Sequence, residues 1–124
     1  MKHLKVALIG NPNVGKTSVF NALTGLNQHV GNYPGITVER KTGTTQLSKD
    51  SKASIVDLPG VYSINPSSKD EEIALNALFD KNNKDYPEVV VVVAEVENLK
   101  RNLLLFTQIK DLGFPTVLAL NMAD

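Results

Sequence analysis

The sequence lacks cysteine altogether and has only two histidines and two arginines among its 124 residues. Without cysteine, disulfide bonds, thiolate nucleophiles and zinc–thiolate sites are all excluded. The histidines, His3 and His29, stand apart with no obvious partner ligands, so we expect both to be ordinary surface residues. We expect the arginines, Arg40 and Arg101, to be surface charges as well, because neither lies in a predicted phosphate-binding loop.

The chain also lacks any concentration of charge or of hydrophobic residues. Lysine and arginine together number 13, as do aspartate and glutamate, so no net field would draw the chain to nucleic acid or anionic lipid. The longest unbroken apolar run, Val89 to Ala94, is far too short to span a bilayer, and the N-terminus "MKHLKVALIG" has no signal-peptide pattern. The sequence therefore predicts one soluble, cytosolic domain with no nucleic-acid partner.

Short apolar runs alternate with stretches of helical periodicity along the chain. This pattern predicts an α/β fold whose sheet is mostly parallel, with helices on both faces and one antiparallel hairpin. The predicted strands are 5–9, 37–47, 53–56, 88–94 and 116–120, and the predicted helices are 16–26, 68–79 and 98–112. Residues 27–35 and 58–66 are predicted to be loops, because they are polar and rich in glycine and proline.

A phosphate-binding motif follows the first predicted strand. The stretch "GNPNVGKTS" matches the pattern G-x-x-x-x-G-K-[ST] in full. The glycines allow backbone N–H groups to turn toward phosphate oxygens, and the start of the helix adds partial positive charge. Lys16 would reach the outer phosphates, and the Thr17 hydroxyl would bind Mg²⁺. The nucleotide-binding residues expected in this loop are Gly10, Asn13, Val14, Gly15, Lys16, Thr17 and Ser18.

Two further motifs follow later strands. In "DLPG", Asp57 could hold Mg²⁺ and Gly60 could donate its N–H to a terminal phosphate. In "NMAD", Asn121 and the carboxylate of Asp124 could read the edge of guanine, although Met122 replaces the lysine of the common motif. Each of these two motifs alone is compatible with an ordinary turn or strand end. Because three such motifs in this order share one sheet edge, we predict a GTP-binding domain.

With "VGNYPGITVERKTG" (30–43), "DLPGVYS" (57–63) and "NLKRNLLL" (98–105), these motifs resemble the N-terminal G domain of ferrous iron transport protein B. The resemblance covers most of the chain and implies a Ras-like P-loop GTPase of three layers. It implies that residues 1–124 are a G domain incomplete on its C-terminal side, followed in the natural protein by helical and membrane permease domains. The domain would then be cytoplasmic in a bacterial inner-membrane protein that takes up Fe²⁺, with any oligomerisation occurring through the full-length protein.

The same resemblance assigns switch loops to residues 28–40 and 58–68. It implies that Thr37 closes on Mg²⁺ together with Thr17 and Asp57. It also implies a K⁺ ion bound by Asn13 and by the carbonyl groups of Gly31 and Tyr33. We expect slow, K⁺-stimulated hydrolysis of GTP to GDP, because Val61 stands where many GTPases carry a water-orienting glutamine. The expected catalytic residues are Lys16, Thr37, Gly60 and Asn13, whereas Asn11 is expected to be only a turn residue.

Three alternatives remain open from the sequence. A ribosome-assembly or tRNA-modifying GTPase would share the asparagine of the phosphate loop, but it predicts a basic surface that the neutral composition does not offer. A phosphate-loop kinase or ATPase would need no guanine-reading motif. A guanine-nucleotide docking module that hardly hydrolyses GTP stays open because of Val61, and a turnover assay would separate it from a switch.

Overall fold

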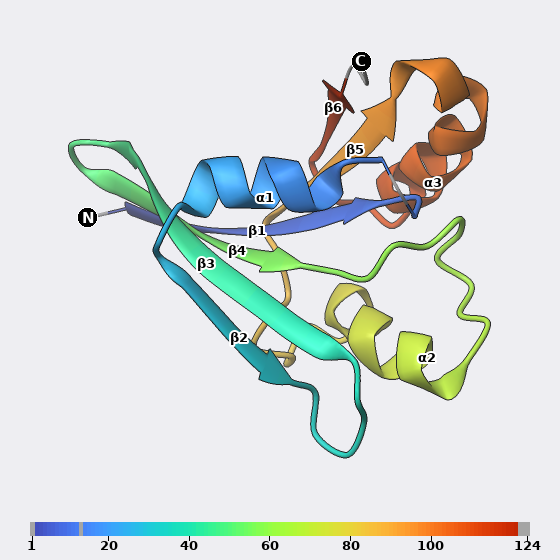
Figure 1. Cartoon of the computed structure of the whole chain (residues 1–124), viewed down its shortest axis with the longest axis horizontal. Helices are drawn as coiled ribbons and strands as arrows, with labels where there is room; N and C mark the ends of the chain where they lie inside the picture. Colours follow the sequence, from blue (N-terminus) through green and yellow to red (C-terminus); the bar gives the residue numbers. More distant parts are fainter. Residues whose placement is uncertain (1, 13, 122–124) are drawn as a thin grey trace.

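The computed structural model describes residues 2–12 and 14–121. It contains one six-stranded sheet with the order β2-β3-β4-β1-β5-β6 (Figure 1). The strands are β1 (Lys2–Gly10), β2 (Gln28–Asn32), β3 (Glu39–Ser48), β4 (Ser51–Asp57), β5 (Val89–Glu95) and β6 (Thr116–Asn121). The helices are α1 (Lys16–Thr24), α2 (Lys69–Leu75) and α3 (Leu99–Asp111), with short 3-10 turns η1 (Asn76–Leu78) and η2 (Val96–Asn98).

The directions of the strands place the predicted motifs at one edge of the sheet. β1 runs parallel to both β4 and β5, and β6 runs parallel to β5. Leu8 is in register with Asp57, and Gly10 is in register with Val93. The carboxyl ends of β1, β4, β5 and β6 therefore meet, which is where ligands bind in open α/β sheets.

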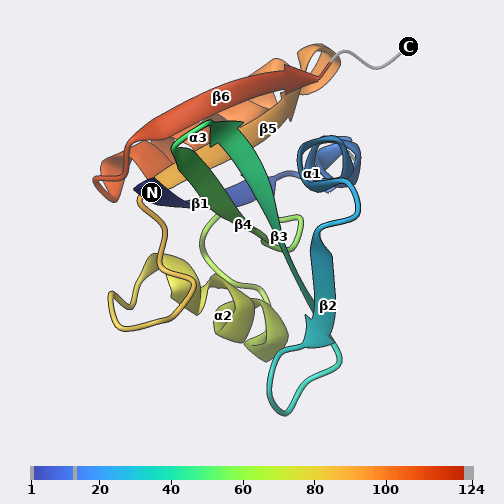
Figure 2. The same ribbon diagram turned by 90° about the vertical axis from the view of Figure 1, so that its left-hand side faces the viewer.

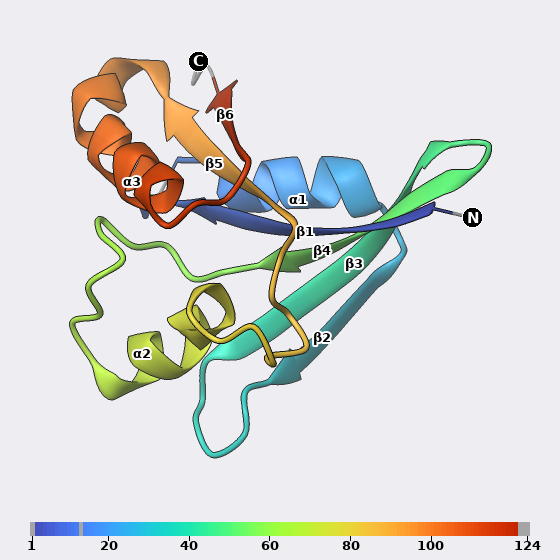
Figure 3. The same ribbon diagram turned by 180° about the vertical axis from the view of Figure 1, so that it is seen from behind.

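The sheet is covered on both faces, as the sequence predicts. Figure 1 shows α1 across one face, and Figure 3 shows α2 and α3 on the opposite face. Along β1, Leu8 belongs to the core under α1 with the fully buried Phe20, whereas Ala7 and Ile9 belong to the core on the other face. This alternation is the two-residue period of a strand that is buried on both sides. None of the described helices combines the length and the apolar character needed to cross a membrane.

The helix α2 begins at the predicted cap. The Ser68 hydroxyl accepts a hydrogen bond from the Glu71 N–H at 3.1 Å, and the Glu71 carboxylate accepts one from the Ser67 N–H at 3.0 Å. Two donors at the start of the helix are thereby satisfied, much as in a capping box. The helix ends at Leu75, earlier than predicted, because the following residues form the turn η1.

The predicted loop over 27–35 is wrong, because residues Gln28–Asn32 form the edge strand β2 (Figure 2). This strand pairs antiparallel with β3, from Gln28 opposite Gly43 to Asn32 opposite Glu39. Most of its side chains are exposed, so the segment carries no buried apolar face for sequence periodicity to detect. β3 consequently has antiparallel partners on both sides, β2 and the predicted hairpin partner β4.

Candidate functional site

The phosphate-loop residues surround a cavity of about 530 Å³ at the carboxyl end of β1. Gly10 is the last residue of β1, and Gly15, with φ of 79°, is the N-cap of α1. The left-handed backbone at Gly15 is the conformation that only glycine adopts without strain. The cavity is lined by Asn11, Pro12, Gly15, Lys16, Thr17 and Gly60. The structure therefore brings residues of two predicted motifs to one place.

The segment after β4 runs directly along the phosphate loop. The Val61 N–H donates a hydrogen bond to the Gly10 carbonyl at 2.9 Å. A Cβ atom on Gly60 would lie 3.0 Å from the Pro12 Cα, and one on Gly10 would lie 2.7 Å from the Val93 carbonyl oxygen. A side chain on Gly10 would clash with the backbone of β5, and one on Gly60 would be tightly packed against Pro12. Val61 itself is 4% exposed and packs in the core, so its side chain does not reach the cavity.

The predicted lysine and aspartate form an ion pair beside this cavity. The Lys16 ammonium group contacts the Asp57 carboxylate, and the two side chains are 11% and 5% exposed. Thr17, the next residue after the lysine, is exposed. Mg²⁺ in nucleotide sites is bound by one or two carboxylates together with hydroxyl and phosphate oxygens. The carboxylate of Asp57 and the hydroxyl of Thr17 are suitable donors for such an ion.

The strand β6 brings Asn121, the first residue of the third motif, against the same loop. The Asn121 side-chain N–H donates to the Val14 carbonyl at 2.9 Å. This amide nitrogen lies only 2.0 Å from where a Cβ atom on Gly15 would be. Asn121, the first residue of the predicted "NMAD" motif, thus lies beside the phosphate loop. Met122, Asp124 and the phosphate-loop residue Asn13 lie outside the described residues.

The residues of the predicted first switch lie away from the cavity at the phosphate loop. Gly31 belongs to β2 and is paired with Arg40, and Thr37 is exposed in the connection between β2 and β3. Tyr33 follows β2, and its N–H donates to the Val38 carbonyl at 3.2 Å. None of these first-switch residues lines the phosphate cavity, which is the cavity of about 530 Å³ at the phosphate loop. Figures 1 and 3 show the connection at the α2 end of the sheet, away from α1.

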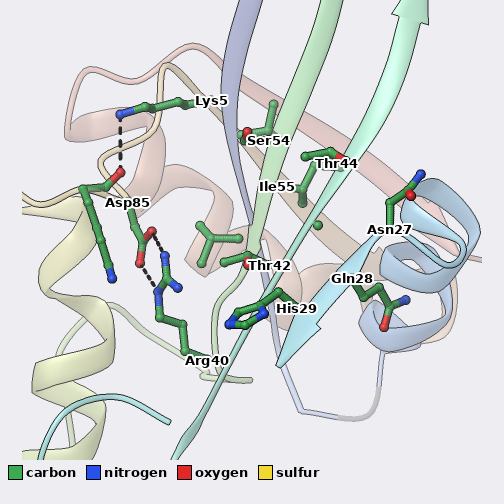
Figure 4. Close-up of a pocket in the computed structure, with 14 residues that line it drawn as sticks. Lys5, Asn27, Gln28, His29, Arg40, Thr42, Thr44, Ser54, Ile55 and Asp85 are labelled. Atoms are coloured by element: carbon green, nitrogen blue, oxygen red, sulfur yellow. Dashed lines mark hydrogen bonds and ion pairs between the residues drawn. The ribbon is translucent and has the colours of Figure 1, made fainter. Parts of the chain in front are cut away.

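A separate cavity of about 500 Å³ lies over β3 and β4, away from the phosphate loop (Figure 4). Arg40 borders it and donates two hydrogen bonds to Asp85, from Nε at 2.8 Å and from Nη2 at 2.5 Å. Asp85 raises the pKa of the Arg40 guanidinium through these bonds. The prediction of a free surface charge is therefore wrong for Arg40, whose side chain is only 20% exposed. Arg101 is exposed as predicted, with its guanidinium 5.5 Å from the ring centre of Tyr62.

Tyr33 has a buried hydroxyl with no hydrogen-bond partner among the described residues. Burial, with a smaller contribution from Asp85, raises the pKa of Tyr33 from 10.0 to about 12. The unfolded chain would therefore lose this proton at lower pH than the folded chain. The contribution of Tyr33 to stability is complete below pH 10 and is lost as the pH rises from about 10 to 12.

We expect Tyr33→Phe to raise the free energy of unfolding at pH 7 by about 1 kcal/mol, because it removes an unsatisfied buried hydroxyl. The variant should also lose part of the alkaline destabilisation between pH 10 and 12. Absorbance titration in the near ultraviolet, with denaturant unfolding at each pH, measures both effects. Tyr62→Phe, at a tyrosine that is 52% exposed, is the control and should leave the late-titrating tyrosine in place.

The sequence did not predict that Asn11, which lines this site, is buried. Its side chain is only 3% exposed, and neither its amide nitrogen nor its amide oxygen has a hydrogen-bond partner among the described residues. A turn residue would ordinarily satisfy its own side chain locally or in solvent. No sequence signal distinguishes a buried asparagine from a turn asparagine in a loop of this length.

Comparison with known proteins places this geometry in one family. A family model described as "Ferrous iron transport protein B" matches residues 4–124. The chain is similar to the Fe(2+) transport protein A/Fe(2+) transporter FeoB fusion protein of Porphyromonas gingivalis (strain ATCC BAA-308 / W83). The two are 48% identical over 121 residues, which cover 98% of this chain and 14% of that protein. The chain spans 14% to 16% of the length of curated relatives of this kind.

Solved structures of FeoB G domains share the fold. The G domain of the T. maritima FeoB iron transporter superposes with a TM-score of 0.85 at 43% identity, covering 95% of this chain and 71% of that one. A mutant of S. thermophilus NFeoB bound to GDP gives a TM-score of 0.82 at 46% identity, covering 98% of this chain and 44% of that one. The chain therefore belongs to the ferrous iron transport protein B family and has the P-loop G-domain fold of its members.

Proposed function

We propose that this chain is the GTP-binding and GTP-hydrolysing switch domain of a bacterial ferrous iron transporter. The observation that carries the proposal is that residues of three predicted motifs meet at the phosphate loop. Lys16 and Gly60 line this cavity, Asp57 contacts Lys16, and Asn121 is bonded to the phosphate loop. A related domain that is 46% identical has been solved with GDP, which supports a guanine nucleotide as the ligand.

Different residues of the chain would bind the phosphates and the base of the nucleotide. The N–H groups after Gly10 and the start of α1 would hold the phosphates, and Lys16 would neutralise charge that develops on the outer phosphate. Gly60, exposed beside the cavity, would donate its N–H to the terminal phosphate. Asp124 would accept hydrogen bonds from the guanine edge, giving preference for guanine over adenine.

Mg²⁺ would be held by the hydroxyl of Thr17 and the carboxylate of Asp57, with Thr37 joining when the first switch closes. When bound, this ion offsets charge between the outer phosphates. The contact of Asp57 with Lys16, the residue next to Thr17, supports these first two residues as ligands. Thr37 is exposed away from the cavity in the arrangement described, so its participation requires the first switch to move.

K⁺ is proposed as the cation that takes the place of an arginine finger. Neither arginine lines the phosphate cavity, since Arg40 is bonded to Asp85 and Arg101 lies against Tyr62. The proposed ligands are Asn13, which lies outside the described residues, and the carbonyl groups of Gly31 and Tyr33. Those two carbonyl groups belong to β2 and the turn after it, so a K⁺ site with these ligands also requires the first switch to move.

The surrounding protein is part of the same proposal. Because the chain spans a small fraction of its curated relatives, we propose that helical and membrane permease domains accompany this G domain. The G domain would lie on the cytoplasmic side of the inner membrane. The switch loops, residues 28–40 and 58–68, would pass the nucleotide state to these domains and so regulate or power Fe²⁺ uptake.

One observation favours a second candidate function. The Val61 side chain is apolar and buried in the core, so it cannot orient an attacking water. A domain that binds guanine nucleotide tightly but hardly hydrolyses it would act as a docking module. Turnover measurements separate this module from a switch.

We expect GTP turnover to be at least about tenfold faster in KCl than in NaCl at equal ionic strength, because a fixed cation would stabilise charge in the transition state. Phosphate release by the intact protein is the measurement. Asn13→Ala should abolish the difference between the salts without reducing the affinity for GDP by more than about twofold. Asn82→Ala, at an exposed loop position, is the matched control. Equal and near-zero turnover in both salts would contradict the K⁺ proposal and favour the docking module.

A further inference from the structure

Two buried asparagines face the same cavity with unsatisfied amide groups. Asn11 of the phosphate loop is 3% exposed, and Asn102 of α3 is 1% exposed. Neither amide atom of Asn11, nor the amide nitrogen of Asn102, has a hydrogen-bond partner among the described residues. Such unsatisfied buried groups are uncommon in native proteins, so each one calls for a physical explanation.

The cavity they share measures about 220 Å³ and lies between the phosphate loop, the end of β5 and the start of α3. The three amide atoms are buried from solvent, so bulk water does not satisfy them as they are placed. Their partners are therefore expected among the protein groups around the cavity. A small inward movement of the cavity walls would bring these groups within hydrogen-bond distance. Glu95, at the end of β5, also lines this cavity and is only partly exposed.

The donors and acceptors of these three residues are complementary. The Glu95 N–H already donates to the Asn102 side-chain oxygen at 2.7 Å. This leaves the Asn102 amide as a donor, Asn11 as a donor and an acceptor, and the Glu95 carboxylate as an acceptor. If Asn102 donates to the oxygen of Asn11, and Asn11 donates to Glu95, these groups are all satisfied in a closed ring. The charged carboxylate is a stronger acceptor for Asn11 than the Asn102 oxygen, which already accepts one hydrogen bond.

We propose that Asn11, Asn102 and Glu95 form a latch that joins the phosphate loop to α3 and positions that loop for the nucleotide. The proposal rests on the proposed guanine-nucleotide function, because Asn11 also lines the phosphate cavity. Binding of phosphate at one side of Asn11 would favour closure of the latch at its other side. Asn102 and Glu95 do not line the phosphate cavity and would act on it only through Asn11, so they are positioning residues.

The latch lies beside the contacts between the second switch and α3. The ring of Tyr62 lies 5.5 Å from the Arg101 guanidinium, and the Ile64 N–H donates to the Gln108 side-chain oxygen at 3.0 Å. Tyr62 and Arg101 both line the same 220 Å³ cavity. Closing the cavity would therefore move the switch and the start of α3 together, which couples the position of α3 to the nucleotide state.

A double-mutant cycle tests the latch in the intact protein. We expect Asn11→Ala and Asn102→Ala each to weaken binding of a fluorescent GDP analogue about tenfold. The double variant should be weakened by about tenfold as well, since either single change already opens the ring. Glu95→Ala should resemble the single variants, whereas Glu95→Gln, which keeps an acceptor oxygen, should restore most of the affinity. Asn98→Ala, an exposed residue of the same cavity wall, should bind like the wild type.

The same cycle is measured on the midpoint of denaturant unfolding, so the latch is tested even if the proposed function fails. A wild type that binds no guanine nucleotide would overturn the proposed function, while coupling in the unfolding cycle would still support the latch. Additive effects of about a hundredfold in the double variant, or equal losses for Glu95→Gln and Glu95→Ala, would overturn the latch. If the asparagine variants fail to fold, the two Glu95 variants decide the question alone.

Discussion

Gly15→Ala is expected to weaken GDP binding by more than about a hundredfold, which corresponds to roughly 3 kcal/mol. The backbone at Gly15 has φ of 79°, a conformation that costs an alanine about 1–2 kcal/mol. A new Cβ atom would also lie 2.0 Å from the amide nitrogen of Asn121, which is bonded to the Val14 carbonyl. The substitution would therefore displace the end of β6 and the phosphate loop together. Titration with a fluorescent GDP analogue measures the loss.

A second glycine separates backbone strain from this steric conflict. Gly113 has φ of 96°, but a Cβ atom there would meet no atom within 4 Å. Gly113→Ala should therefore lower the free energy of unfolding by about 1–2 kcal/mol through strain alone and leave GDP affinity unchanged. If Gly15→Ala bound GDP as tightly as Gly113→Ala, the close approach of Asn121 would not be what fixes the nucleotide site.

The fold was predictable wherever burial repeats with the period of a helix or a strand. The strand β5 was evident as a run of valines because it lies between two parallel neighbours and is largely buried on both faces. The strand β2 was not predictable, because its polar and exposed side chains give no pattern. What holds β2 in place is backbone pairing with β3, and backbone hydrogen bonds leave no trace in residue type.

The contacts of the candidate site were predictable where chemistry fixes the residue type. Lys16, Asp57 and Asn121 lie together as the motifs indicated, because each motif follows a parallel strand that ends at the same edge. The state of Asn11 was not predictable, since only the three-dimensional path of the loop buries it. The pairing of Arg40 with Asp85 joins residues far apart in the chain, and no local signal indicates such a contact.

Lys16→Ala is expected to weaken GDP binding by more than about a hundredfold and to abolish measurable GTP turnover. The lysine lines the phosphate cavity, and its charge would pair with the phosphates, which carry most of the nucleotide's negative charge. The same substitution leaves the Asp57 carboxylate, 5% exposed, without its cation. Breaking a buried ion pair in this way costs roughly 3–5 kcal/mol of folding free energy. Loss of binding and loss of stability are therefore expected together.

A double variant distinguishes these two losses. In Lys16→Ala with Asp57→Asn, no unpaired charge remains buried, so the free energy of unfolding should recover by about 2 kcal/mol or more relative to Lys16→Ala. GDP affinity should not recover, because neither the phosphate-binding cation nor the proposed Mg²⁺ ligand is restored. Lys81→Ala, at an exposed loop position, is the matched control and should change neither quantity. If GDP affinity recovered with stability, Lys16 would act only by keeping the loop folded, and its proposed contact with phosphate would be wrong.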